Sequence, residues 1–305
     1  MRLIPAFFKL VRWSNLFFIV LTQLLFYFCI YLPLYQTQQI HLLSWLIFAS
    51  VCIAAAGYII NDYFDLNIDQ INKPDKNVLN SIINRRWAIL WHLVLSLSGI
   101  GATIIAVGFG KWYLIIANMV CVALLWLYST SFKRQLLIGN IVISLLSAWT
   151  VLILFFAQVP FSEAFNNQNS ITLKFFRLAF LYGGFAFIIS LVREAIKDIE
   201  DREGDAHYGC RTLPIYAGVR ATKIYTTIWL VVLIAALIIL QLYVLQFGWI
   251  WAVIYSIVLI ICPLIYLLSQ LMKAQSITNY RKLSALTKLI MLTGILSMIF
   301  FRLYF

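Results

Sequence analysis

Charged residues are scarce in this sequence: only 11% of its 305 residues are Asp, Glu, Lys or Arg. Soluble domains normally contain about 25% charged residues. A chain that is 63% hydrophobic could not cover its own surface with polar groups, and the mean hydropathy is +0.93. The composition therefore identifies an integral membrane protein.

Histidine is also scarce, and the cysteines are not spaced in pairs. The chain has 3 His and 5 Cys, and the cysteines show no paired spacing, so neither a disulfide framework nor a zinc site is expected. The cysteines are Cys29, Cys52, Cys121, Cys210 and Cys262, and all but Cys210 fall in apolar runs. A net charge of +12 would suggest nucleic acid for a soluble protein. Here it reflects membrane topology, and neither a nucleic-acid nor a protein partner is predicted.

Long apolar runs are abundant. A helix needs about 20 mostly apolar residues to cross a bilayer, and these runs lack the alternation of a lipid-facing barrel strand. We therefore expect an all-α, polytopic single domain over residues 1–305. Its nine spans are predicted at Leu16–Leu34, Leu42–Ile60, Trp87–Val107, Trp112–Tyr128, Leu136–Val159, Phe175–Val192, Ile224–Leu245, Trp249–Leu271 and Leu286–Tyr304.

The basic residues predict an orientation. Of the 23 Lys and Arg residues, 19 lie before the first span or in the even-numbered loops, and four lie on the other side. The positive-inside rule then places the N-terminus in the cytoplasm and the C-terminus outside, in the cytoplasmic (inner) membrane. Met1–Trp13 has no cleavage site after it and is interpreted as retained.

The acidic residues are concentrated in two places. Of 11 Asp and Glu residues, four follow the second span, six surround the loop after the sixth, and Glu163 is the remaining one. Each cluster contains three aspartates at positions i, i+3 and i+7, which on a helix share one face within about 60°. The first triplet is Asp62, Asp65 and Asp69, and the second is Asp198, Asp201 and Asp205.

Stacked like charges destabilise a helix, and a bound divalent cation removes that objection. Oxygen-only ligands suit Mg²⁺, which usually shares its coordination with substrate phosphates. An EF-hand is excluded because the loop glycine and terminal Glu are missing at the required offsets. The alternative is that each cluster is a solvated extension of a membrane helix, but two matched triplets favour the metal site.

Basic residues lie close to both clusters. They serve as topology determinants or, together with the metal, as ligands of a diphosphate. They are Lys73, Lys76, Arg85, Arg86, Lys133, Arg134, Arg193, Lys197, Arg202 and Arg211. The aromatic residues are expected to face lipid or the core, and a few of them to line a hydrocarbon tunnel and stabilise an allylic cation.

The pattern Asn61-Asp-x-x-Asp-x-x-x-Asp69, with its counterpart at Asp198–Asp205, resembles the two signature motifs of the UbiA superfamily of intramembrane prenyltransferases. The resemblance extends over nearly the whole chain. It includes Arg12 and Asn15 before the first span, Asn72-Lys-Pro-Asp-Lys76, Tyr128 with Lys133, Gly139-Asn140, and Gly209 to Pro214.

The resemblance implies nine helices around a central cavity with a cytoplasmic cap. It also implies that Mg²⁺ and basic side chains bind a polyprenyl diphosphate, whose prenyl group passes to an acceptor. The six motif aspartates would hold metal and carry catalysis, and which of them acts on the acceptor stays open. The implied substrate-binding residues are Arg12, Asn15, Asn61, Lys73, Tyr128, Lys133, Arg193 and Lys197.

The stretch after Lys76 bears on the acceptor. Members that act on aromatic acceptors often continue with a second proline and a Ser-Gly pair, whereas this chain continues Asn77-Val-Leu-Asn-Ser81. The stretch is similar to the branch that transfers geranylgeranyl groups to a lipid glyceryl phosphate, and Arg85-Arg86 would suit the acceptor phosphate. An aromatic acceptor, phosphotransfer to a polyprenyl carrier, and transport of a divalent cation or anionic lipid remain as alternatives.

Overall fold

The computed structural model describes residues 3–72, 84–160 and 170–304, and the regular elements within these ranges are all helical. In this part of the chain, nine helical segments are long and apolar enough to cross a membrane. They correspond one to one with the predicted spans. The second and sixth segments continue past their predicted ends to Leu66 and Glu200, which carries the acidic motifs beyond the apolar stretches.

Short interruptions divide several of these segments into two helices. The helices that begin before residue 100 are α1 (Leu3–Leu10), α2 (Trp13–Phe26), α3 (Leu32–Tyr35), α4 (Ile40–Asn72) and α5 (Arg85–Val107). They are followed by α6 (Trp112–Thr130), α7 (Ile138–Gln158), α9 (Ser170–Glu200), α10 (Arg202–His207), α11 (Leu213–Tyr216) and α12 (Gly218–Leu245). The last are α13 (Ile250–Ser256), α14 (Cys262–Lys273), α15 (Ile277–Leu296) and α16 (Ile299–Tyr304).

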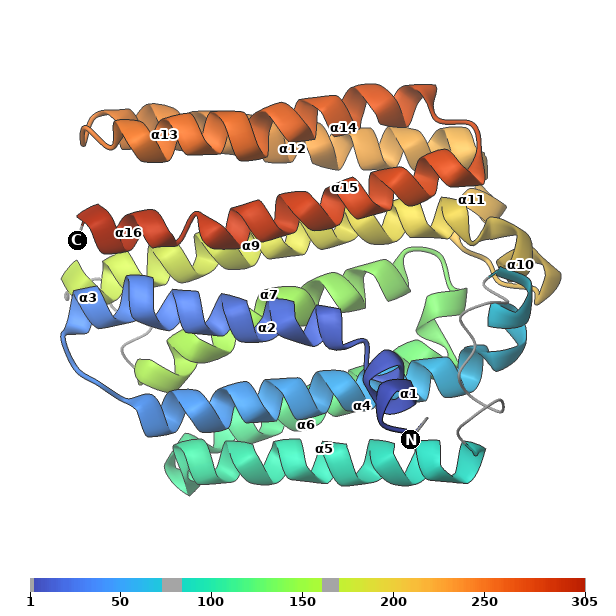
Figure 1. The fold of residues 1–305 in the computed structure, drawn as a ribbon, viewed down its shortest axis with the longest axis horizontal. Helices are drawn as coiled ribbons and strands as arrows, with labels where there is room; N and C mark the ends of the chain where they lie inside the picture. Colours follow the sequence, from blue (N-terminus) through green and yellow to red (C-terminus); the bar gives the residue numbers. More distant parts are fainter. Residues whose placement is uncertain (1–2, 73–83, 161–169, 305) are drawn as a thin grey trace.

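The long helices run roughly along one axis, with α10 and α11 at the right-hand end in Figure 1. Helix α4 packs against α5 and α6, whereas α9 packs against α7, α12 and α15. Helix α10 contacts both α4 and α9. Helix α4 and the segment after the sixth span therefore meet, whereas residues 73–83 of the loop predicted to complete the cap lie outside the described residues.

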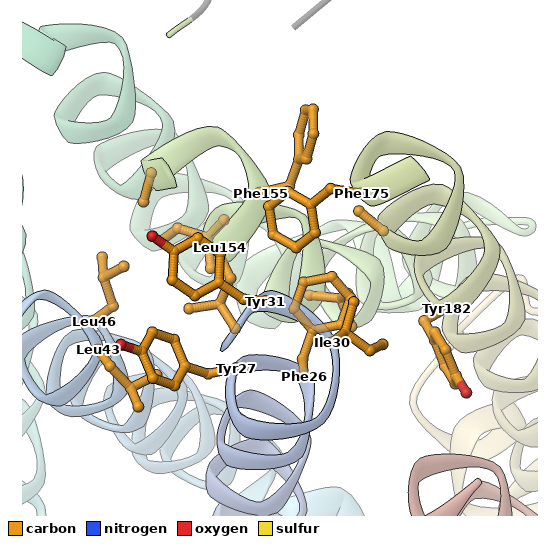
Figure 2. Packing of buried hydrophobic residues seen from close by; sticks show 14 of the residues in the cluster. Phe26, Tyr27, Ile30, Tyr31, Leu43, Leu46, Leu154, Phe155, Phe175 and Tyr182 are labelled. Carbon is orange, nitrogen blue, oxygen red and sulfur yellow. The ribbon is translucent and has the colours of Figure 1, made fainter. Parts of the chain in front are cut away.

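The opposite end is closed by an apolar cluster (Figure 2). Phe26 and Tyr31 from the first span pack with Phe155 of α7 and Phe175 of α9, and all four are buried. Phe175 lies 23 residues before Asp198 on α9, which corresponds to about 35 Å along a helix. The apolar core and the aspartate motifs therefore occupy opposite ends of the molecule.

Two spans contain a π-helical turn, at Tyr27–Tyr31 and Ile257–Ile261. In each case a proline, Pro33 or Pro263, follows two residues after the turn. Proline lacks an N–H group and clashes with the carbonyl four residues before it, and a wider turn accommodates both effects. The apolar pattern predicted the spans but not these turns.

The outer helices expose apolar side chains. On α12, Ile228, Ile239 and Leu242 are exposed. This segment has the highest mean hydropathy of the nine that the structure describes. Exposed apolar surface on this scale is costly in water and favourable in lipid. The arrangement is that of an integral membrane protein.

Candidate functional site

A cavity of about 940 Å³ lies between the helices and is lined by residues of α1, α2, α4, α6, α7, α9, α10 and α15 and of the segments that connect them. The described aspartate side chains of both motifs line it: Asp62, Asp65, Asp198, Asp201 and Asp205. The helices that carry the two motifs are far apart in sequence, and the fold brings their aspartates to one cavity. Asp69 lies on α4, but its side chain is outside the part that the structure describes, as is all of Lys73.

Each described aspartate of the first motif is paired with a cation from another element. Arg12 donates from Nη2 to Asp62 Oδ1 at 2.6 Å, and its guanidinium lies 5.1 Å from the centroid of the Tyr58 ring. Lys133 donates from Nζ to Asp65, and also to Asn61 Oδ1 at 3.5 Å. These contacts offset the like-charge repulsion that the triplet would otherwise cause.

The loop that carries Lys133 depends on a glycine. A Cβ atom at Gly139 would lie 2.9 Å from Lys133 Cα and 3.0 Å from the Phe132 carbonyl oxygen. Only glycine therefore allows the start of α7 to approach this loop so closely. The close approach places Lys133 beside α4, and it explains why Gly139 stands at this position.

The second motif is not one continuous helical face, and the prediction that all three aspartates share one was wrong. Helix α9 ends at Glu200, Asp201 lies between the helices, and Asp205 belongs to α10. The backbone is only slightly interrupted, because Asp205 N still donates to the Asp201 carbonyl oxygen at 3.2 Å. The break turns the chain, yet all three side chains still line the cavity.

Asn140 of α7 holds the first aspartate of this motif. Its Nδ2 donates to Asp198 Oδ2 at 2.8 Å, and its side chain is almost entirely buried. The sequence pattern contained Asn140 but assigned it no role. The amide donates a hydrogen bond without adding a charge, whereas the adjacent Lys197 acts on Asp198 through its positive charge.

Two predicted cations on α9 share one carboxylate that sequence reasoning did not single out. Arg193 Nη1 donates to Glu194 Oε1 at 3.0 Å, and Lys197 Nζ donates to Glu194 Oε2 at 3.1 Å. Glu194 is only 8% exposed. Arg193 Nε is buried with no hydrogen-bond partner among the described residues, so this patch retains donor capacity for an anion.

The remaining predicted residues also belong to the cavity. Asn15 and Tyr128 line it. By contrast, Arg85 and Arg86 are exposed at the start of α5 and are not among the residues that line the cavity. They fit the topology role that the sequence left open for them.

Residues 14–291 match the model of the UbiA prenyltransferase family. This chain belongs to that family. It is 30% identical to the digeranylgeranylglyceryl phosphate synthase of Methanosphaera stadtmanae over 83% of this chain and 86% of that protein. It is 35% identical to the synthase of Methanospirillum hungatei over 58% of each, so the match spans a little over half of that relative.

A solved UbiA homologue from Archaeoglobus fulgidus, described as bound to GPP and Mg²⁺, superposes with a TM-score of 0.59. It is 15% identical and covers 96% of this chain and 99% of that one. The resemblance confirms the UbiA fold for nearly the whole chain. The predicted family and the all-helical fold class are thereby confirmed.

The donor set of this UbiA chain fits Mg²⁺. Carboxylate and amide oxygens are the ligands that this ion prefers, and it usually combines one or two carboxylates with substrate phosphates and water. Among the described residues, no group of three or more His, Cys, Asp and Glu side chains is close enough to hold a metal alone. A diphosphate bound in this cavity would supply further oxygen ligands to such an ion.

Cys210 also lines the cavity of this UbiA protein. Burial of its thiol, helped by the nearby Asp205 carboxylate, raises the pKa of Cys210. A thiol that stays protonated at neutral pH is a poor metal ligand. The carboxylate and amide oxygens of the motifs are better suited to Mg²⁺ than this thiol.

Proposed function

We propose that this protein transfers a polyprenyl group, geranylgeranyl in particular, from its diphosphate to a lipid glyceryl phosphate and releases diphosphate. One observation carries the proposal. A single cavity gathers aspartates from α4 and α9–α10 together with Arg12, Lys133, Arg193 and Lys197, and it continues between apolar spans. The names of the relatives support the lipid glyceryl phosphate as acceptor.

The roles of the side chains follow from their contacts. Asn61 and the motif aspartates would hold Mg²⁺, which neutralises charge on the diphosphate when it is bound. Arg12, Lys133, Arg193 and Lys197 then donate hydrogen bonds to the diphosphate oxygens as the bond from C1 to oxygen breaks. To do so, Arg12 and Lys133 turn from Asp62 and Asp65 toward the substrate.

Aromatic side chains that line the cavity stabilise the positive charge that develops on the allylic carbon of the donor. The side chains of Tyr58 and Tyr128 line the same cavity as the motifs, and the face of an aromatic ring attracts positive charge. The acceptor hydroxyl attacks C1, and its proton passes to a carboxylate of the motifs. The donor's apolar chain lies between the spans, where water is excluded.

We also propose that residues 1–305 act as one intramembrane domain. It would lie in the cytoplasmic membrane, with the N-terminus inside and the C-terminus outside. The distribution of Lys and Arg supports this orientation. Reporters that fold on only one side of the membrane, fused to each terminus in turn, test it, and an active cytoplasmic reporter at the C-terminus would contradict it.

The acceptor is tested with purified full-length protein, Mg²⁺ and geranylgeranyl diphosphate. Geranylgeranylglyceryl phosphate and 4-hydroxybenzoate are supplied separately, diphosphate release is followed, and products are identified by mass. We expect turnover with the lipid phosphate only. Turnover with 4-hydroxybenzoate alone would replace the proposed acceptor with an aromatic one.

A further inference from the structure

Lys288 is a cation of the cavity that neither the sequence motifs nor the proposed diphosphate site uses. It lies on α15 within the last membrane-spanning segment and lines the cavity. Ionisable residues inside membrane spans are costly, and they commonly mark substrate pathways. We therefore expect Lys288 to bind a ligand in this cavity.

The contacts of Lys288 contain no carboxylate. Its Nζ donates to Ser14 Oγ at 3.3 Å and lies 5.4 Å from the centroid of the Phe18 ring. Both partners belong to α2, which packs against α15. Within the residues that the structure describes, none of the ion pairs includes Lys288.

The surroundings of Lys288 are positively charged. Arg193, Arg12 and Lys197 are the charged groups that act on it. Arg193 and Lys197 share a single carboxylate, Glu194. Lys288 itself pairs with no carboxylate in the described part of the chain. Its donor capacity is therefore open to an anion other than the diphosphate, and a phosphate monoester, which carries about two negative charges at neutral pH, is such an anion.

Resting on the proposed function, we propose that Lys288 and Ser14 form the subsite that binds the phosphate of the lipid acceptor. A diphosphate that shares Mg²⁺ lies beside the carboxylates, where Asp65 and Lys133 meet. A monoester without metal needs cations and hydroxyl donors instead, and the seam between α2 and α15 supplies both. Arg85 and Arg86, the earlier candidates for this phosphate, lie outside the cavity lining.

The test measures binding separately from turnover. Full-length protein in lipid nanodiscs is titrated with geranylgeranylglyceryl phosphate, with geranylgeranylglycerol, which lacks the phosphate, and with geranylgeranyl diphosphate plus Mg²⁺. The variants are Lys288→Gln and Lys288→Arg. Lys282→Gln is the matched control, because Lys282 is an exposed lysine on the same helix.

We expect Lys288→Gln to weaken binding of the lipid phosphate by about tenfold or more, the usual effect of losing a charged hydrogen bond. Binding of geranylgeranylglycerol and of the diphosphate should change by less than about twofold. Lys288→Arg should restore most of the affinity, and Lys282→Gln should behave as wild type. A folded Lys288→Arg protein keeps the test valid if Lys288→Gln unfolds.

Unchanged affinity of Lys288→Gln for the lipid phosphate would overturn the subsite, as would failure of the wild type to bind it. An equal loss of diphosphate binding would overturn it too, because Lys288 would then serve the donor. Binding of the lipid phosphate without product formation would overturn the proposed reaction instead. The two proposals therefore fail by different results.

Discussion

At the scale of single residues, the aspartates of the cavity are held by partners that a substrate can replace. Arg12 pairs with Asp62, Lys133 with Asp65, and Asn140 with Asp198. Two of these partners are the cations expected to meet the diphosphate. Asp62 and Asp65 are therefore each neutralised by a cation until a metal and its phosphate ligand arrive, when the cations and these carboxylates each gain a ligand of opposite sign.

The substitution Asp62→Asn removes the negative charge of this side chain and keeps its shape. The amide keeps the side-chain volume but loses the negative charge, so we expect prenyl transfer to fall by about a hundredfold or more. The pair with Arg12 is partly exposed, so the free energy of unfolding should fall by about 1 kcal/mol or less. Diphosphate release and thermal unfolding are the two measurements.

The control for this substitution is Glu203→Gln. Glu203 is an exposed acidic residue of α10 and is absent from the cavity lining, so its variant should turn over as wild type does. Equal losses in both variants would mean that overall acidity, rather than the motif, supports the reaction.

At the scale of elements, two motifs with the same sequence spacing adopt different structures. Helix α4 runs unbroken through its motif to Asn72, whereas α9 stops at Glu200 and a new helix starts at Arg202. The spacing predicted a shared face for both because it describes a helix and not its end. Motif membership was predictable from sequence, and the break was not, because the aspartate spacing is the same in both motifs. The helix that follows the break, α10, contacts α4.

Gly139→Ala tests the element that positions Lys133. The added methyl group would contact the backbone of Lys133 and Phe132 at distances shorter than normal, so this loop and the start of α7 must move apart. We expect prenyl transfer to fall by about tenfold or more because Lys133 loses its place beside Asp65. Steady-state turnover of the purified variant measures this.

Gly101→Ala is the matched control, since a Cβ there meets no atom within 4 Å. Inside α5 the alanine should leave turnover unchanged and stabilise the protein by about 0.5–1 kcal/mol. Wild-type turnover in Gly139→Ala would show that the position of this loop does not matter for the reaction.

At the scale of the whole molecule, stability and chemistry are separated along the bundle. The aromatic cluster around Phe155 and Phe175 closes one end, and the aspartates line a cavity that reaches the other. The nine spans were predictable because apolar length is a local property. Pairs of residues that are distant in the sequence were not predictable, because a single sequence does not state which elements meet. Arg12 and Asp62, 50 positions apart, are an example. Glu194 differs, because its partners Arg193 and Lys197 lie on the same helix, so its spacing in the sequence could have indicated it.

Metal removal should therefore stop the reaction without unfolding the protein. Treatment with EDTA is expected to abolish prenyl transfer and leave the helical circular dichroism unchanged, because the described core rests on apolar packing. Added Mg²⁺ should restore activity. Prenyl transfer that persists after complete chelation would rule out the metal's role.

In the proposed reaction, both aspartate motifs bind one diphosphate together with Mg²⁺. The most direct measurement is the affinity of a non-reactive thiolo analogue of geranylgeranyl diphosphate, with and without Mg²⁺, for the wild type, Asp62→Asn and Asp201→Asn. We predict Mg²⁺-dependent binding that either substitution weakens by about tenfold or more. Binding that ignores Mg²⁺, or that survives the loss of either motif, would contradict the account.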